Sequence, residues 1–399
     1  MSEFKTLSDY DVTGKRVILR ADLNVPMKDG LVTDSSRIDR TLPTIIELVE
    51  KGARVVLITH WGRPKGERVA AMTVKPVAEA LASKLGKDVK FAQDCIGDVA
   101  SSIVNSLTDG DVCVLENLRY YKEETDNDLE FAKKLASLGD IYVNDAFSCA
   151  HRAHASTEAL ARLLPAAAGR LMQAELEALS SALEAPKRPL AALVGGAKVS
   201  SKLDVLENLS KKVDMLIIGG GMANTFLHAQ GINVGKSLCE HDLAETALKI
   251  LKTANEAGCK ILLPVDGVVA KEFGANVENR TVAISDIAVD EMMLDVGPAS
   301  IVELKDELSK CKTIVWNGPM GAFEIEPFDA GTNGAAQAAA KLTKAGSLVS
   351  VAGGGDTVAA LDHAGVKEDF TYISTAGGAF LEWLEGKELP GVEVLRSVS

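Results

Sequence analysis

The sequence lacks the features that direct a chain out of the cytoplasm. It has no apolar run of about 18 residues, so we expect no transmembrane helix. The opening residues, 1–6, lack the basic and apolar stretches of a secretory signal peptide. The six cysteines are scattered and form no Cys-x-x-Cys pair, which disfavours a disulfide framework or a zinc site. We therefore expect a cytoplasmic protein with buried thiols.

An excess of positive charge is also absent. Lys and Arg total 43 against 56 Asp and Glu, which gives a net charge of −13. A chain this acidic is not expected to bind nucleic acid or an anionic membrane non-specifically. An anionic substrate must therefore be held by a local cluster of basic residues.

The chain does contain a repeated alternation of apolar runs of strand length with helix-like segments. Its 399 residues are enough for two domains. Apolar strands that alternate with amphipathic helices are typical of parallel sheets covered on both faces. We predict an α/β protein with two doubly wound, Rossmann-like parallel-sheet domains joined by a helix and a hinge. The predicted bounds are 1–170 for the N-terminal domain, 171–185 for the interdomain helix and 186–386 for the C-terminal domain.

The candidate functional residues follow from the predicted strands, because ligands of open parallel sheets bind beyond the carboxyl ends of the strands. The strands of the first half are predicted at Arg16–Ala21, Arg54–Thr59, Asp111–Leu115 and Ile141–Asn144, with helices at Thr41–Lys51, Val74–Leu85 and Leu129–Leu138. Those of the second half are predicted at Leu190–Val194, Met215–Ile218, Ile261–Pro264, Thr313–Trp316, Ser347–Val351 and Thr371–Ser374. Leu171–Leu183 is predicted to be the connecting helix.

A glycine-rich stretch follows the predicted strand Ser347–Val351. Three glycines, Gly353, Gly354 and Gly355, allow a tight turn that brings backbone N–H groups close to an anion. The helix-like pattern that continues from Thr357 offers the positive end of a helix dipole. Asp356 beside a phosphate site indicates an intervening Mg²⁺. Taken alone, the stretch is equally compatible with an ordinary turn and an Asp cap.

Basic and polar residues gather after the strands of the first half. They are Asp22, Asn24, His60, Arg63, Arg119 and Arg152, and Arg37 is expected in the loop between the first strand and its helix. Arginine forks bind phosphate and carboxylate through paired hydrogen bonds, and Asp22 and Asn24 can bind hydroxyl groups. The cluster predicts a small, polyanionic, hydroxylated ligand, although any one arginine alone is compatible with a surface ion pair. A metal site at His151 and His154 and a catalytic thiol at Cys149 are both disfavoured, because no supporting motif surrounds them.

The second half carries residues suited to phosphate. Lys198 and Lys202 open a predicted helix one turn apart and can meet a phosphate chain from one side, although solvated lysines show the same pattern. Two stretches resemble nucleotide-binding motifs but do not match them. Gly231-Ile-Asn-Val-Gly235-Lys236-Ser237 has the wrong glycine spacing for a P-loop and follows a helix. The stretch 219–224 lacks the third glycine of the dinucleotide fingerprint.

Taken together, the motifs resemble the phosphoglycerate kinase family over essentially the whole chain. They are Arg20-Ala-Asp-Leu-Asn-Val-Pro26, His60-Trp-Gly-Arg-Pro-Lys-Gly66, Glu116-Asn-Leu-Arg119, Asn144-Asp-Ala-Phe147, His151-Arg-Ala-His-Ala-Ser156, Gly195-Gly-Ala-Lys-Val199, Ile218-Gly-Gly-Gly-Met222, Leu263-Pro-Val-Asp266, Val315-Trp-Asn-Gly-Pro319 and Gly353-Gly-Gly-Asp-Thr357. The resemblance implies reversible phosphoryl transfer between 1,3-bisphosphoglycerate and ADP, giving 3-phosphoglycerate and ATP. It also implies Mg²⁺ with the nucleotide, a monomer, and a C-terminal tail, 387–399, that packs onto the N-terminal domain.

The resemblance also implies residue roles. It implies 3-phosphoglycerate contacts for Asp22, Asn24, Arg37, His60, Arg63, Arg119 and Arg152. It implies nucleotide contacts for Lys202, Gly219, Gly220, Asn317, Glu324, Gly353, Gly354, Gly355, Asp356 and Thr357, with Asp356 on the metal. Arg37, Lys198, Gly354 and Gly377 are the implied catalytic residues. Three departures from the family pattern are Trp61, Ser148-Cys149 and Ala376.

The implied chemistry needs no general base, because a carboxylate nucleophile is already ionised near neutral pH. Catalysis is then positioning and charge neutralisation, with closure of the two domains to exclude water. One alternative is an inactive nucleotide-binding protein on the same fold, which intact Arg37, Lys198, Lys202 and Asp356 disfavour. The other is a dehydrogenase or another nucleotide-dependent α/β enzyme, which the failed fingerprint disfavours.

Overall fold

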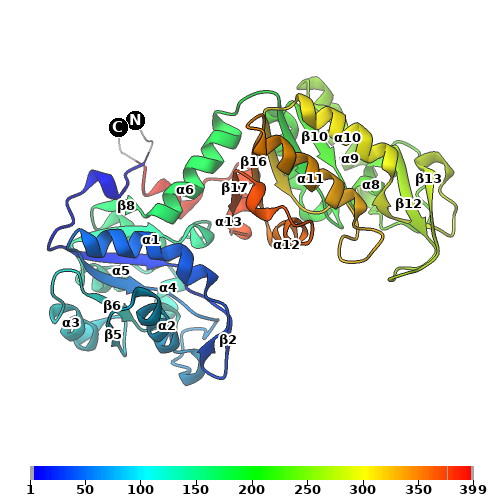
Figure 1. Ribbon diagram of the computed structural model, residues 1–399. Coiled ribbons are helices and arrows are strands. Elements are labelled where there is room, and N and C mark those ends of the chain that lie inside the picture. The colour runs from blue at the N-terminus through cyan, green and yellow to red at the C-terminus, as the bar shows by residue number, and fades with distance from the viewer. Residues whose placement is uncertain (1–3, 375, 397–399) are drawn as a thin grey trace. The chain divides into compact units, whose positions relative to one another are not determined.

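The computed structural model describes residues 4–374 and 376–396, and the chain divides into two compact units. The first unit runs to Leu176 and takes in the chain again from Glu388, and the second unit is Glu177–Lys387. Each unit contains a six-stranded parallel sheet flanked by helices (Figure 1). The predicted fold class, two doubly wound α/β domains, is therefore confirmed.

The sheet of the first unit has the strand order β5-β6-β4-β1-β7-β8. Its strands are β1 (Arg16–Ala21), β4 (Arg54–Ile58), β5 (Val89–Ala92), β6 (Val112–Leu115), β7 (Ile141–Asp145) and β8 (Ala166–Ala168), and its helices are α1 (Ser36–Glu50), α2 (Lys75–Leu85), α3 (Gly97–Asn105), α4 (Lys122–Thr125) and α5 (Leu129–Ala136). A short antiparallel ribbon joins β2 (Met27–Lys28) to β3 (Leu31–Val32). The chain changes direction across the sheet between β1 and β7, so a ligand is expected at the carboxyl ends of these two strands.

Both faces of this sheet are buried, which explains the continuous apolar strands of the sequence. Successive side chains of a strand point to opposite faces. Leu19 of β1 packs in one core with Ile45 of α1, whereas the preceding residue, Ile18, packs in a second core with Leu135 of α5. The sheet is thus a rigid layer that carries the loops at its carboxyl edge.

The parallel sheet of the second unit has the order β11-β10-β9-β15-β16-β17. Its strands are β9 (Leu190–Val194), β10 (Met215–Ile218), β11 (Lys260–Leu262), β15 (Thr313–Asn317), β16 (Val349–Gly353) and β17 (Tyr372–Ser374), and its helices are α7 (Leu203–Lys212), α8 (Gly221–Ala229), α9 (Ala244–Glu256), α10 (Pro298–Lys310), α11 (Ala330–Lys344), α12 (Gly355–His363) and α13 (Gly378–Leu384). Numbered by their order along the chain, these strands lie 3-2-1-4-5-6, the dinucleotide-fold arrangement. The crevice is therefore expected between β9 and β15.

A second sheet in this unit is absent from the sequence prediction. It is antiparallel, with the order β13-β12-β14, and consists of β12 (Asp266–Ala270), β13 (Asn279–Ala283) and β14 (Met292–Val296). β13 has only one buried residue, and burial in β14 is interrupted, so neither strand carries a continuous apolar run. A pattern search that relies on such runs passes over these strands.

Two local predictions are wrong. Arg37 does not lie in a loop, because α1 already begins at Ser36. The side chain of Asp34 accepts a hydrogen bond from the N–H of Ser36, and Asp39 lies in the first turn, so a polar segment without apolar periodicity still starts a helix. Lys198 and Lys202 do not share a helix. A 3₁₀ turn, η8 (Val199–Ser201), separates them, and α7 begins after Lys202.

The connecting segment and the tail have the following structure. Helix α6 (Arg170–Leu179) is followed by one π turn, η7 (Ser180–Glu184), where a single helix is predicted. The C-terminal helix α14 (Pro390–Glu393) packs within the first unit, where the N–H of Gly391 donates to the carbonyl of Ala150 at 2.9 Å. Residues 397–399 of the predicted tail lie outside the described residues. Among the described residues, no helix is both long and apolar enough to cross a bilayer.

Two candidate anion-binding sites

The first candidate site is a cavity of about 480 Å³ in the first unit. Its lining includes three predicted residues, Arg63, Arg119 and Arg152, and adds Lys65, Gly66, Tyr121, Lys122, Thr125 and His154. Five of these side chains are cationic, and none of the described lining residues is a carboxylate. In an acidic protein, such a cavity selects an anion.

The remaining predicted residues of this half form a cluster at the carboxyl end of β1. Both Nη1 of Arg37 and Oγ of Ser148 donate to Oδ2 of Asp22. Oδ1 of the same carboxylate accepts from the N–H of Asn24 at 3.2 Å. Burial opposes ionisation of this carboxyl, but the charge of Arg37 and the hydrogen bond from Ser148 hold the pKa of Asp22 below its ordinary value.

A shared backbone segment connects this cluster with the cavity. Oδ1 of Asn24 accepts from the N–H of Gly62 at 3.0 Å, and Nη1 of Arg119 donates to the carbonyl of Gly62 at 2.9 Å. Burial, followed by the charge of Arg20, lowers the pKa of Arg119. Burial and the same arginines lower the pKa of His154 to about 4. His154 is therefore neutral near neutral pH, and the positive charge of the cavity comes from Arg and Lys.

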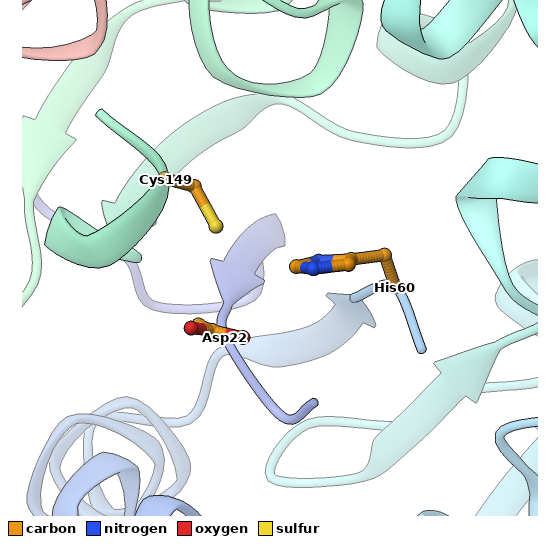
Figure 2. A group of neighbouring side chains, drawn as sticks. All are labelled: Asp22, His60 and Cys149. Atoms are coloured by element: carbon orange, nitrogen blue, oxygen red, sulfur yellow. The ribbon is translucent and has the colours of Figure 1, made fainter. Parts of the chain in front are cut away.

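Asp22, His60 and Cys149 also present one potential metal-ligand atom each, within 4.8 Å of one another (Figure 2). Nη2 of Arg20 lies 3.0 Å from Nδ1 of His60 and 3.9 Å from Sγ of Cys149, and Arg37 pairs with Asp22. Guanidinium groups thus already contact all three side chains and repel a cation. Burial also raises the pKa of the Cys149 thiol, which disfavours a thiolate ligand or nucleophile.

The second candidate site is a cavity of about 500 Å³ in the second unit, at the carboxyl edge of its parallel sheet. Of the predicted residues, Gly220, Glu324 and Asp356 line it. The sequence prediction missed its apolar wall, which consists of Leu238, Phe273, Met292, Met293, Leu294, Met320 and Phe323. Much of this wall comes from the antiparallel sheet and its loops, so the missed strands also concealed these residues.

A network of hydrogen bonds at the predicted crevice ties the strand ends together. Nζ of Lys202 donates to the carbonyl of Gly195, after β9, at 2.6 Å and to that of Asn317, in β15, at 3.1 Å. Nδ2 of Asn317 donates to the carbonyl of Gly353 at 2.8 Å, and Oγ1 of Thr357 accepts from the N–H of Gly318 at 2.7 Å. Burial lowers the pKa of Lys202 to about 8, although Asp356 opposes the shift.

Two close backbone approaches require glycine. Gly354 has a φ of +99°, and a Cβ there would lie 2.6 Å from Nδ2 of Asn317. Gly220 has a φ of +66°, and a Cβ there would lie 2.6 Å from the carbonyl oxygen of Gly196. Both glycines immediately precede a helix, α12 and α8, so each places free helix N–H groups at the sheet edge. The loops of the second half therefore have the geometry expected for phosphate.

Other predicted residues of this half lie at the surface or in the loops around the cavity. Lys198 is exposed before η8, Asp356 is exposed in the first turn of α12, and Gly377 is exposed before the short α13. Gly219 follows β10, Gly353 ends β16 and Gly355 begins α12, and none of the three lines the cavity. Ala376 is 1% exposed, and its N–H donates to Oγ of Ser374 at 3.2 Å. Its methyl group is thus accommodated within the fold.

Comparison with known proteins places the chain in a family. A family model described as phosphoglycerate kinase matches residues 7–387. A phosphoglycerate kinase of Methylorubrum extorquens is 64% identical over 398 residues and all of both chains, and one of Rhizobium meliloti is 65% identical over 98% of this chain and 99% of the relative. The solved structure of phosphoglycerate kinase from Coxiella burnetii has a TM-score of 0.93 at 45% identity, and that from Pyrococcus horikoshii has 0.80 at 35%, each covering 98% of both chains.

Proposed function

The chain belongs to the phosphoglycerate kinase family, and on this premise we propose that its two cavities hold the two substrates of one phosphoryl transfer. The reaction of the family is 1,3-bisphosphoglycerate + ADP ⇌ 3-phosphoglycerate + ATP, and the chain is a phosphotransferase with a carboxyl group as acceptor. The observation that carries the proposal is the contrast between the cavities. One is lined by five cations, the other by glycine loops, apolar side chains and Asp356.

The cationic cavity of the first unit binds 3-phosphoglycerate in this proposal. Arg63, Arg119 and Arg152 take the phosphate, because guanidinium forks match its oxygens. The cluster around Asp22 takes the rest of the molecule, where Arg37, His60 and Asn24 can meet the carboxylate and the hydroxyl group. Arg37 suits this role because its side chain is 42% exposed although it is paired with Asp22.

The cavity of the second unit binds the nucleotide. Its apolar wall suits a base, Glu324 at its edge suits ribose hydroxyls, and Lys202 with the loops at Gly219–Gly220 and Gly353–Gly355 suits the phosphate chain. Asn317 and Thr357 hold these loops in position through the hydrogen bonds described above.

Mg²⁺ accompanies the nucleotide in this proposal. Asp356 is an exposed carboxylate on the cavity lining, and Mg²⁺ is commonly bound through one carboxylate together with substrate phosphates and water. Within the described residues, Oδ1 of Asn317 is buried without a hydrogen-bond partner beside the loop of Gly354, so an acceptor for a metal-bound water is also present. The residues present thus fit the ion, which would neutralise phosphate charge when bound.

Catalysis follows from positioning and charge. A carboxylate nucleophile needs no base, so the chain has to orient two anions and stabilise the phosphoryl group between them. We assign this stabilisation to Arg37, Lys198 and the N–H groups near Gly354 and Gly377. Because the two substrates belong to different units, transfer requires the units to close on each other, which also keeps water from the acyl phosphate. We further propose that the enzyme works as a cytoplasmic monomer, which its six free cysteines suit.

A coupled assay with 3-phosphoglycerate and Mg-ATP tests the proposal. Arg63→Ala should raise KM for 3-phosphoglycerate by roughly tenfold or more and leave KM for ATP unchanged. Lys202→Met should raise KM for ATP and leave KM for 3-phosphoglycerate unchanged. If either variant raises both constants equally, the division of the substrates between the two cavities is wrong.

A further inference from the structure

Arg20 is the largest charged side chain buried in the first unit, and the reaction scheme gives it no role. It lies in β1 with 0% exposure, one residue before the strand ends. Its Nε donates to Oγ of Ser156 at 2.8 Å, its Nη1 donates to the carbonyl of Ala21, and its Nη2 lies 3.0 Å from Nδ1 of His60. His60 is assigned to the substrate site, so a buried guanidinium in contact with it affects the protonation and the tautomer of its ring.

The direction of the contact with His60 follows from the chemistry of arginine. A guanidinium carries only N–H donors and does not lose its proton in proteins. Nδ1 of His60 must therefore accept, so it carries a lone pair and no hydrogen. An imidazolium, which donates from both nitrogens, does not fit this contact. The arrangement leaves one form of His60, the neutral ring with its hydrogen on Nε2.

The directions of the hydrogen bonds at Ser156, on the side of Arg20 away from His60, are also determined. Oγ of Ser156 donates to Oε1 of Glu124 at 2.6 Å, and the N–H of Ser156 donates to Oε2 at 2.9 Å. Glu124 is fully buried, so its hydrogen bonds and the charge of Arg20 compensate each other. Because the serine hydroxyl gives its hydrogen to Glu124, its lone pair faces Arg20. The donor and the acceptor of each hydrogen bond that links Glu124, Ser156, Arg20 and His60 are therefore determined.

We propose that Arg20 is a positioning residue of the 3-phosphoglycerate site, which holds His60 as a neutral hydrogen-bond donor through Nε2. The role of His60 toward substrate rests on the proposed function. Figure 2 shows the ring of His60 extending toward the space between Asp22 and Cys149. Because Nδ1 accepts from Arg20, the N–H that the ring still offers is the one on Nε2. A donor at that place meets a carboxylate or hydroxyl of the substrate, whereas the other tautomer would present a lone pair and repel it.

The surroundings of His60 agree with a neutral ring. The charged and titratable groups that face it are Arg20 and Asp22 at the end of β1, Arg37 of α1, Arg119 of η3 (Leu118–Tyr120) and Cys149 of η4 (Phe147–Cys149). Asp22 alone favours an imidazolium, and its oxygens already accept from Arg37, Ser148 and Asn24. Burial and then Arg20 lower the pKa of His60 well below its usual range.

Nitrogen NMR of the full-length protein, labelled with ¹⁵N-histidine, tests the tautomer without any substrate. The signal of His60, assigned by its loss in His60→Gln, should show a protonated Nε2 and an unprotonated Nδ1 from about pH 5.5 to pH 8. The signal of the exposed His241 in the same samples serves as the internal reference. A protonated Nδ1, or an imidazolium near pH 6.5, would overturn the proposal.

Two substitutions of His60 test whether its Nε2 donor is used in substrate binding. Gln places an amide donor near the site of Nε2, whereas Asn places its amide near the site of Nδ1. His60→Asn should raise KM for 3-phosphoglycerate by roughly tenfold or more, and His60→Gln by clearly less, with KM for ATP unchanged in both. Equal KM values for 3-phosphoglycerate in the two variants would overturn the positioning role even where the NMR result stands.

Arg20→Lys tests the link itself. A single ammonium cannot reach Ser156 and His60 together, so His60 should show mixed tautomers and KM for 3-phosphoglycerate should rise, with a smaller change in kcat. A folded Arg20→Lys variant in which KM rises while His60 keeps its tautomer would overturn the mechanism. If the variant does not fold, the wild-type NMR and the two His60 variants decide the question.

Discussion

Nη1 of Arg37 donates to Oδ2 of Asp22, so the first turn of α1 is held against the carboxyl end of β1. The same carboxylate oxygen accepts from Oγ of Ser148. Asp22 therefore holds Arg37 in position before substrate arrives, and the arginine is still 42% exposed. A cation that is held in place but accessible is suited to meet a transferred phosphoryl group.

Removal of the cations assigned to the phosphoryl group should reduce turnover more than binding. We expect Arg37→Ala and Lys198→Ala each to lower kcat by roughly 10²–10³-fold, with KM for ATP changed only slightly. Steady-state kinetics in both directions measure this, and Lys211→Ala, on the exposed surface of α7, is the control. An unchanged kcat in both variants would remove these residues from the mechanism.

The Mg²⁺ assignment depends on Asp356. Asp356→Ala should weaken the affinity for ADP at fixed Mg²⁺ by about tenfold, and addition of a chelator should weaken wild-type binding to a similar level. Isothermal titration calorimetry measures both effects. Asp362→Ala, near the end of the same helix, is the matched control and should bind Mg-ADP normally. Equal ADP affinities of wild type and Asp356→Ala in Mg²⁺ would contradict the assignment.

Nucleotide binding should depend on pH through Lys202. Burial lowers the pKa of Lys202 to about 8, so in the free enzyme the ammonium loses its proton as the pH rises through that value. The neutral amine does not attract phosphate, and the dissociation constant for Mg-ADP should therefore rise above about pH 8, toward tenfold per pH unit. Lys202→Met should bind weakly at every pH and show no such rise. A flat profile in the wild type would mean that Lys202 does not contact the phosphates.

Gly354 and Gly355 offer a test of backbone geometry at adjacent positions. Gly354→Ala places a methyl group at a φ of +99° and against Asn317, so we expect a loss of roughly 1–3 kcal/mol in unfolding free energy and weaker nucleotide binding. A Cβ at Gly355 would meet no atom within 4 Å, and this residue lies in the first turn of α12, so Gly355→Ala should leave stability nearly unchanged. Urea denaturation compares the two, and equal stabilities would contradict the geometric argument.

Asp295 should make stability fall with rising pH. It is buried in the wall of the second cavity, and its carboxylate accepts from the N–H of Gly331, in the first turn of α11, at 2.7 Å. Burial raises its pKa to about 7, whereas an unfolded Asp titrates near 4. The folded chain thus holds the proton more tightly, and this contribution, complete below about pH 4, is lost as the pH rises through about 7.

Asp295→Asn should therefore flatten the dependence of stability on pH. We expect the difference in unfolding free energy between about pH 5 and pH 8 to shrink by on the order of 1–3 kcal/mol. Urea denaturation at both pH values measures it, with the exposed Asp306→Asn as the control. Identical pH dependence in Asp295→Asn and wild type would show that this carboxyl does not titrate in the range.

The buried parallel strands could be predicted from the sequence with almost correct bounds. β1, β9 and β10 agree residue for residue, because a strand covered on both faces requires a continuous apolar run. The half-exposed antiparallel strands carry no such run, and with them the sequence concealed Phe273 and the rest of the apolar wall. Apolar periodicity also failed to locate the start of α1 before Arg37, where Asp34 accepts from the N–H of Ser36 and Asp39 lies in the first turn.

The candidate site was visible in the sequence only as a set of residue types. Arg20 looks like one more basic residue near a strand end, and nothing in its neighbours reveals that Ser156 and His60 take up its hydrogens. Lys65 and Lys122 line the cationic cavity because the loop after β4 approaches the start of α4, which is distant in sequence. These contacts depend on tertiary packing, which a local pattern does not encode.

The packing of Gly391 against Ala150 has a consequence for biosynthesis. The segment that covers Ala150 is made after the whole of Glu177–Lys387 has been synthesised. Domains commonly fold as they emerge during synthesis, with the N-terminal one first. Here the second unit has all its residues before the first unit receives the segment from Glu388 that completes it. The first unit therefore begins to emerge before the second unit but is completed after it.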